Sequence, residues 1–318
     1  MKLCGLRLRF GICTIAAVLS AFLSVPRSFA ADDLSHALTQ AFKGKDYMIR
    51  NFWQGGTLGY DAAGQRIGDA DPGYWTTDGI VRIEKIEVTP NRVLHVVCRR
   101  MIVNVRSDAF DYTASRGERS DRREIDIDLG QQEATSSFVE SVFSKIFIAD
   151  PNSFLDAVPE YWKDCIQAAV SGSGDKRRPC RLGPHFSGIF SASAANMPPV
   201  KVVPASPSNP PVIQSDPAEL KESALHVGNG VLAPKVVYDP EPSYSQLASQ
   251  AGKQGTCVLT LIVDSSGSAK NIQISKPLGY GLDEQAVSTV GTWKFEPARK
   301  NGQPVSVHVS VEIMFHMR

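Results

Sequence analysis

A proline-rich stretch between residues 196 and 217 limits how this chain of 318 residues can fold. Proline fixes its φ angle and has no backbone N–H, so such a segment favours extended conformations and cannot form a packed core. We therefore predict a linker over residues 191–230 between two folded regions, residues 31–190 and residues 231–318. The prolines of this stretch are Pro198, Pro199, Pro204, Pro207, Pro210, Pro211 and Pro217.

The first thirty residues have the pattern of a secretory signal peptide. Lys2, Arg7 and Arg9 form a basic start, residues 10–25 are apolar, and residues 28–30 give a small-x-small cleavage pattern. The apolar run is shorter than the roughly twenty residues that span a bilayer. We expect a cleaved leader and a mature protein that is periplasmic or secreted. The alternative is an uncleaved leader that anchors the protein in the inner membrane, facing the periplasm.

The composition suits two modest globular domains. Hydrophobic residues make up 42% of the chain. Without the four basic residues of the leader, 30 basic and 33 acidic residues remain, a net charge of −3. This balance gives no electrostatic argument for binding nucleic acid or anionic lipid.

Residues 31–190 are predicted to form an α+β domain in which an antiparallel meander precedes helices. Alternating apolar residues indicate the strands, and apolar residues at three- and four-residue spacings indicate the helices. The predicted elements are helices over residues 32–42, 134–148 and 154–170, the last divided at Pro159, strands over 47–53, 58–61, 80–88, 93–105 and 125–129, and a polar hairpin loop over 108–122.

The C-terminal region is predicted to have the order β-β-α-β, a sheet with a helix across one face. Two strands over residues 257–264 and 270–275 precede a helix that begins near Leu282. Asp283 and Glu284 favour the positive end of that helix dipole. After the tight turn at Asn301-Gly302, apolar and polar residues alternate in a final strand over 305–315.

Four motifs in this region occur in a fairly specific order: the Asp264–Gly267 turn, Leu282-Asp283, Trp293-x-Phe295-x-Pro297-Ala298 and Asn301-Gly302-x-Pro304-Val305. In this order, residues 231–318 resemble the C-terminal domain of the TonB family, the energy transducers of the Gram-negative envelope. The resemblance implies a domain that binds partner proteins and does no chemistry. In that family the last strand is an open sheet edge, which captures an extended segment of an outer-membrane receptor by strand addition. Carried over, the partner-binding edge strand is Val305, Val307, Val309, Val311, Ile313 and Phe315.

A full transducer of that family keeps an N-terminal transmembrane helix with a histidine that engages the inner-membrane proton-channel complex. Residues 10–25 contain no histidine, and a whole extra region precedes the linker. We expect the proton-channel complex as a partner only if the leader is retained. Residues 31–190 resemble no family of known function.

Four cysteines remain after leader cleavage, and an even number in an oxidising compartment permits disulfides. Cys165 and Cys180 are close in sequence, and the loop that holds Cys180 could fold back onto the preceding helix. They are our candidate disulfide, with two free thiols as the alternative. Cys98 and Cys257 lie in apolar strand patterns, where a buried thiol is expected.

No catalytic motif competes with these patterns. The sequence has no G-x-S-x-G elbow, no phosphate loop and no zinc-finger cysteine spacing. We predict a non-enzymatic envelope protein, without cofactor or metal, that binds an envelope partner by strand addition in connection with TonB-dependent transport. Two alternatives stay open: a membrane-anchored transducer, and a periplasmic enzyme or ligand-binding protein whose activity lies in residues 31–190.

Overall fold

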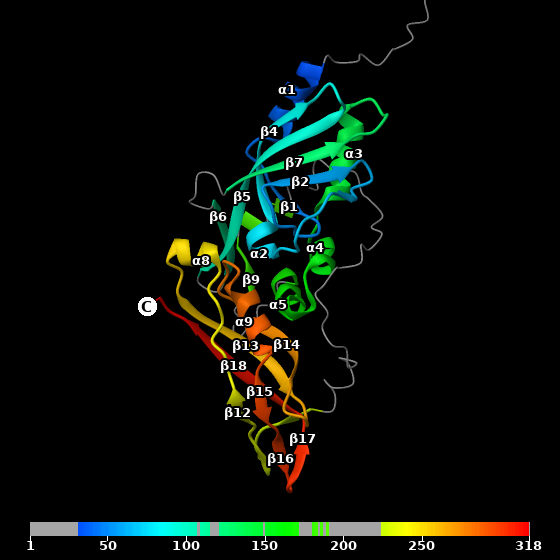
Figure 1. Cartoon of the computed structure of the whole chain (residues 1–318). Coiled ribbons are helices and arrows are strands. Elements are labelled where there is room, and N and C mark those ends of the chain that lie inside the picture. Colours follow the sequence, from blue (N-terminus) through cyan, green and yellow to red (C-terminus); the bar gives the residue numbers. More distant parts are fainter. Residues whose placement is uncertain are drawn as a thin grey trace, which may run out of the picture.

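The structure is a computed structural model that describes residues 31–106, 109–114, 121–148, 150–171, 180–183, 185–186, 189–190 and 224–317. Figure 1 shows an elongated molecule, with the N-terminal strands at one end and the C-terminal strands tapering to the other. The predicted leader and residues 191–223 of the predicted linker lie outside the described residues.

The N-terminal half is built on a sheet with nine strands in the described part of the chain. Its path runs β3-β2-β7-β5-β4-β1-β8, and β6 and β9 extend it beside β5. Strand β5 (Val93–Arg106) pairs antiparallel with β4 (Ile80–Val88) on one side. Its other side pairs first with β7 (Arg122–Asp128) and then with β6 (Ala109–Ala114). The other strands are β1 (Asp46–Ile49), β2 (Thr57–Asp61), β3 (Arg66–Ile67), β8 (Phe147–Ile148) and β9 (Arg181–Leu182).

Helices α1 (Ala31–Phe42) and α3 (Ser136–Ile146) contribute to one hydrophobic core with this sheet. Leu34, Leu38 and Phe42 follow one another at four-residue intervals, so they share one face of α1, and all three are buried. The side chain of Thr135 accepts a hydrogen bond from the Phe138 N–H and caps α3. Helix α3 contributes Val139, Val142, Phe143 and Ile146 to the same core.

Three further helices belong to a second core: α2 (Trp75–Asp78), α4 (Pro151–Ala157) and α5 (Glu160–Val170). Trp75 has no exposed surface, and the rings of Trp162, Phe154 and Phe110 meet it edge to face. Pro159 separates α4 from α5, as the sequence predicts.

The C-terminal half has a sheet whose strand order, among the described residues, is β10-β18-β13-β14. These strands are β10 (Leu225–His226), β13 (Gly255–Val263), β14 (Ala269–Lys276) and β18 (Val307–Phe315). Helix α9 (Leu282–Val290) packs against β13 and β14 and buries Leu282, Ala286 and Val290. The remaining elements are α8 (Gln246–Ala251), β11 (Val231–Leu232), β12 (Lys235–Tyr238), β15 (Lys294–Glu296), β16 (Ala298–Lys300) and β17 (Gln303–Val305).

The two halves are in direct contact and share the second core. The Tyr280 N–H donates to the Val103 carbonyl at 2.9 Å, and Asn104 forms an isolated β-bridge with Gly279. The Lys253 ammonium donates to Asn104 Oδ1 at 2.8 Å. The core extends without a break from Trp75 in the first half to Phe315 in the last strand. Whatever path the linker takes, these contacts hold the two halves together.

The predicted α+β class and the β-β-α-β order of the C-terminal region are confirmed. Some element predictions differ from the structure. Phe147 and Ile148, at the end of the predicted helix over 134–148, form β8 and pair with β1. Leu225 and His226, within the predicted linker, form β10 and pair with β18. Residues 109–114 of the predicted hairpin loop form β6, because β5 extends past β7 and offers them a partner from Met101 to Arg106. The predicted final strand is divided at Ser306, where β17 ends its pairing with β16 and β18 begins its pairing with β13.

Candidate partner-binding edge

Strand β18 pairs along one side with β13, from Val307 opposite Val263 to Phe315 opposite Gly255. On the other side, the Leu225 N–H donates to the Ser306 carbonyl at 2.8 Å. The backbone groups of successive residues in a strand point to opposite sides. The groups that point away from β13 therefore belong to the even-numbered residues.

Strand β10 covers only the first part of this outward side. It runs parallel to β18, with Leu225 opposite Val307 and His226 opposite His308, and this register uses the outward groups of His308. The next outward groups belong to Ser310, Glu312 and Met314, whose side chains are exposed. Within the described ranges, these three residues lie opposite β13 on one side, and no strand pairs with them on the outward side. We call this segment, Ser310 to Met314, the open edge.

The structure places the six predicted edge residues in two different elements. Val305 lies in β17, opposite Ala298, and is not part of the last strand. The other five lie in β18, where they face β13 through their backbone. Val307, Ile313 and Phe315 are buried, and Val309 and Val311 are half-buried. Their side chains support the inner face of the strand, while the backbone groups available for pairing belong to the residues between them.

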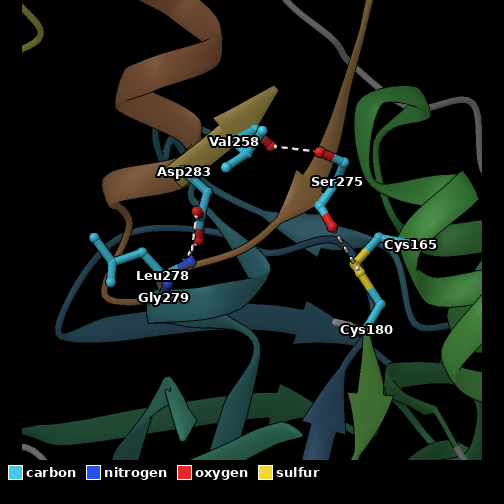
Figure 2. Close-up of a disulfide and its surroundings, with 7 residues drawn as sticks. All are labelled: Cys165, Cys180, Val258, Ser275, Leu278, Gly279 and Asp283. Carbon is cyan, nitrogen blue, oxygen red and sulfur yellow. Dashed lines mark hydrogen bonds between the residues drawn. A yellow bond between two sulfur atoms is a disulfide. The ribbon is translucent and has the colours of Figure 1, made fainter. Parts of the chain in front are cut away.

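A buried acidic pair lies at the start of α9, where the two halves meet. Asp283 has no exposed surface, and its two oxygens accept hydrogen bonds from the Leu278 and Gly279 N–H groups, each at 2.7 Å (Figure 2). Glu284 is 3% exposed. Its Oε1 accepts from the Thr76 hydroxyl at 2.8 Å and from the Trp162 indole N–H at 3.3 Å. Both of these donors come from the N-terminal half.

The environment of this pair opposes negative charge. Burial, and after it the charge of Asp283, raises the pKa of Glu284 to about 8. Burial raises the pKa of Asp283 to about 6, although the hydrogen bond from Gly279 acts in the opposite direction. Among the residues described, Glu284 Oε2 is buried without a hydrogen-bond partner. The sequence indicates two acids at the positive end of a helix dipole and does not show their burial. For Glu284 the reason is that both hydrogen-bond donors lie more than a hundred residues away.

A cleft of about 470 Å³ opens between the two halves beside α2 and α8. On the N-terminal side, Arg123 donates to Asp78 Oδ1 at 2.8 Å, and Arg100 approaches the same oxygen at 3.5 Å. The C-terminal side includes Tyr244 and Gln285. Most residues that line the cleft have polar side chains, and the Asp78 carboxylate is already shared by two guanidinium groups.

The candidate disulfide pair is joined in the structure. Cys165 on α5 and Cys180 are bonded, with their Cα atoms 5.4 Å apart. Figure 2 shows this bridge beside β14, where Cys180 Sγ lies 3.7 Å from the Ser275 carbonyl oxygen. Cys98 and Cys257 are buried free thiols, and burial raises the pKa of both. The bridge therefore belongs to the contact between α5 and the C-terminal sheet.

Two features are absent from the described residues. No group of three or more histidine, cysteine, aspartate or glutamate side chains there could hold a metal ion. No described helix has the length and apolar character needed to cross a membrane.

The last part of the chain is similar to known proteins. Residues 240–317 match the family model described as Gram-negative bacterial TonB protein C-terminal. Protein tonB2 of Pseudomonas aeruginosa is 38% identical over 82 residues, which are 26% of this chain and 30% of that protein. Protein TonB of Vibrio cholerae is 28% identical over 78 residues, 24% of this chain and 32% of that protein.

A solution NMR structure of the Pseudomonas aeruginosa TonB CTD is also similar, with 19% identity over 29% of this chain and 91% of that one. The TM-score of this match is 0.23. The chain thus spans about a third or less of the curated relatives it matches.

The fold is that of an α+β protein. In the described part of its C-terminal sheet, one side of β18 has no partner strand from Ser310 to Met314. Residues 240–317 are similar to the TonB C-terminal domain, in agreement with the motifs in the sequence.

Proposed function

We propose that this protein is an exported, non-enzymatic envelope protein that binds a partner by strand addition to β18, in connection with TonB-dependent transport. The observation that carries the proposal is the open edge. Ser310, Glu312 and Met314 present backbone N–H and C=O groups outward, and β13 supports the strand from the opposite side. Such an edge can extend its sheet by one strand when an extended peptide docks.

The side chains beside the open edge favour a particular kind of segment. Val309 and Val311 are half-buried on the inner face, so they leave apolar surface for a neighbouring strand. Ser310 and Glu312 on the opposite face are exposed. Because directly opposed side chains interact across a sheet, the proposed partner is an extended segment whose apolar residues alternate with polar ones. A segment of an outer-membrane receptor is our preferred partner.

The decisive experiment is an NMR titration of the isotope-labelled mature chain with synthetic peptides from the N-terminal segments of outer-membrane receptors. We expect chemical-shift changes to cluster between His308 and Met314. Changes confined to residues 31–190 would move the binding function to the first half and reject strand addition.

The proposal also includes the location of the protein in the cell envelope. We favour a periplasmic or secreted protein with a cleaved leader over an anchored transducer that contacts the proton-channel complex. Mass spectrometry of the mature N-terminus separates the two. A chain that starts at Ala31 supports the first, whereas an intact Met1 supports the second.

Ligand binding between the two halves is the second candidate function, because the cleft is of a size typical for small ligands. This candidate predicts that substitutions in the cleft, such as Gln285→Ala, change ligand-dependent thermal stability without affecting peptide capture at β18. Screening small carboxylates and sugars for a shift in the melting temperature tests it.

A further inference from the structure

Strand β10 lies on the same side of β18 on which a partner strand would be added. We infer that β10 is an internal cap, which competes with the partner for the backbone groups of Ser306 and His308. The inference rests on the proposed function, since a cap matters only if the edge captures a strand. It goes beyond that function, because β10 of this same chain determines how much of the β18 edge a partner can use.

The geometry of the cap is a short parallel pairing. The Leu225 N–H donates to the Ser306 carbonyl at 2.8 Å, and Leu225 and His226 lie opposite Val307 and His308. The imidazole rings of His226 and His308 stack with centroids 5.1 Å apart and planes 25° from parallel. Backbone and side chains therefore both hold β10 on the edge.

The cap is small enough to be displaced. It is two residues long, and parallel pairing is slightly less stable per residue than antiparallel pairing. His226 is exposed, and the next residue, Val227, is 47% exposed, so only the half-buried Leu225 adds apolar contact with the core. Such a local contact opens far more readily than the strands of the core.

Two binding modes follow from this arrangement. A segment of about five residues can pair with Ser310, Glu312 and Met314 while the cap stays in place. A longer segment reaches His308 only after β10 has left. Its apparent affinity is then its intrinsic affinity multiplied by the fraction of molecules in which the edge is uncapped.

The first test measures the cap without a partner. Leu225→Pro removes the N–H that donates to Ser306, and Leu225→Ala keeps that N–H while trimming the side chain. We expect the His308 amide to exchange its hydrogen at least about tenfold faster in the proline variant than in the alanine variant. The amides of Val309 and Val311, which face β13, should exchange equally in both. Equal exchange at His308 in the two variants would overturn the cap.

The second test uses a defined strand, the blocked octapeptide Lys-Val-Thr-Val-Thr-Val-Thr-Lys, titrated into the whole mature chain. In the wild-type protein the shifts should be confined to the open edge. In Leu225→Pro they should extend to His308, with an affinity at least about threefold higher. Binding that is the same in both proteins refutes competition by β10. Absence of binding at β18 in both refutes the proposed function instead, and amide exchange still decides whether β10 caps the edge.

A variant with a reversible disulfide tests the cap even if the Leu225→Pro protein does not fold. His226→Cys with His308→Cys allows a crosslink between the paired residues, and His308→Cys alone is its control. In the oxidised double variant the peptide shifts should stay confined to the open edge. On addition of a mild thiol they should extend to position 308, because reduction frees a β10 that no longer has the stack of His226 on His308. Shifts at position 308 in the crosslinked protein would show that β10 does not compete.

Discussion

The hydroxyl of Thr76 donates a 2.8 Å hydrogen bond to Glu284 across 208 residues of sequence. The donor lies on α2 of the N-terminal half, and the acceptor lies in the first turn of α9 in the C-terminal half. The indole of Trp162 donates to the same oxygen. A carboxyl group of the C-terminal half is therefore buried and takes both of these hydrogen bonds from the N-terminal half.

This burial predicts that stability falls as pH rises. Burial raises the pKa of Glu284 from 4.5 to about 8, so between these values the folded protein binds more protons than the unfolded chain. The free energy of unfolding then decreases with pH across that window, and the contribution is fully present only below about pH 4.5. Urea unfolding of the wild type at several values between pH 5 and 8.5 measures the slope.

Glu284→Gln is the matched variant for that slope. The amide oxygen can still accept from Thr76 and Trp162, but the side chain no longer titrates. We expect a flatter dependence on pH above pH 5, with a remaining slope in the same direction from Asp283, whose pKa burial also raises. An unchanged slope in this variant would show that the carboxyl group is not buried as described.

Gly279 lies where the two halves come close together. Its φ angle is +85°, and a Cβ atom there would lie 2.7 Å from the Val103 carbonyl oxygen. Gly302 has a similar φ angle of +82° with nothing within 4 Å of an added Cβ. Gly302→Ala should cost about 1 kcal/mol for the left-handed backbone alone. Gly279→Ala should cost about 1–3 kcal/mol more, because the contact with β5 must also shift. Denaturant unfolding measures both, and equal losses would contradict the close approach.

The Cys165–Cys180 bridge predicts a measurable loss of stability on reduction. It joins residues 15 positions apart. In the chain-entropy model a loop of this size is worth about 3 kcal/mol. Non-reduced peptide mapping of protein made through the secretory route should recover the two linked peptides, and reductant should lower the unfolding free energy by about that amount. Four free thiols in the exported protein would reject the bridge.

Two proline substitutions in β18 distinguish an effect on peptide binding from an effect on the stability of the fold. Ser310→Pro removes an outward N–H and leaves the β13 ladder intact, so it should weaken peptide binding about fivefold or more and barely change the unfolding free energy. Val309→Pro removes an N–H that faces Leu261 on β13, so it should destabilise the domain by about 1–3 kcal/mol. The NMR titration, with circular dichroism as the folding control, distinguishes them. Full peptide affinity in a folded Ser310→Pro protein would count against strand addition.

Limited proteolysis tests the predicted linker. We expect the first cuts between residues 195 and 225, because a proline-rich segment has no packed core to protect it. The two products should nevertheless elute together in gel filtration, because Trp75, Trp162 and Leu259 belong to one shared core. They should separate only in denaturant. Protection of the whole region from cleavage would show that the boundary is misplaced.

Much of the local structure followed from the sequence. The apolar spacing of Leu34 and Leu38, the break at Pro159 and the alternation along 305–315 are local patterns, and the periods of helices and strands fix their meaning. The TonB resemblance likewise depended on four short motifs in order, and the family match over residues 240–317 confirms it.

Tertiary structure decided which side of the last strand is open and what surrounds the acidic pair. Alternation shows that Val309 and Ser310 face opposite ways, but only the pairing with β13 and β10 shows whose backbone groups point outward. In the sequence Glu284 is an ordinary first-turn acid, and only the folded structure shows that Thr76 and Trp162 donate hydrogen bonds to it. Local patterns record which side chains avoid water, whereas hydrogen-bond partners and pKa values depend on residues that only folding brings together.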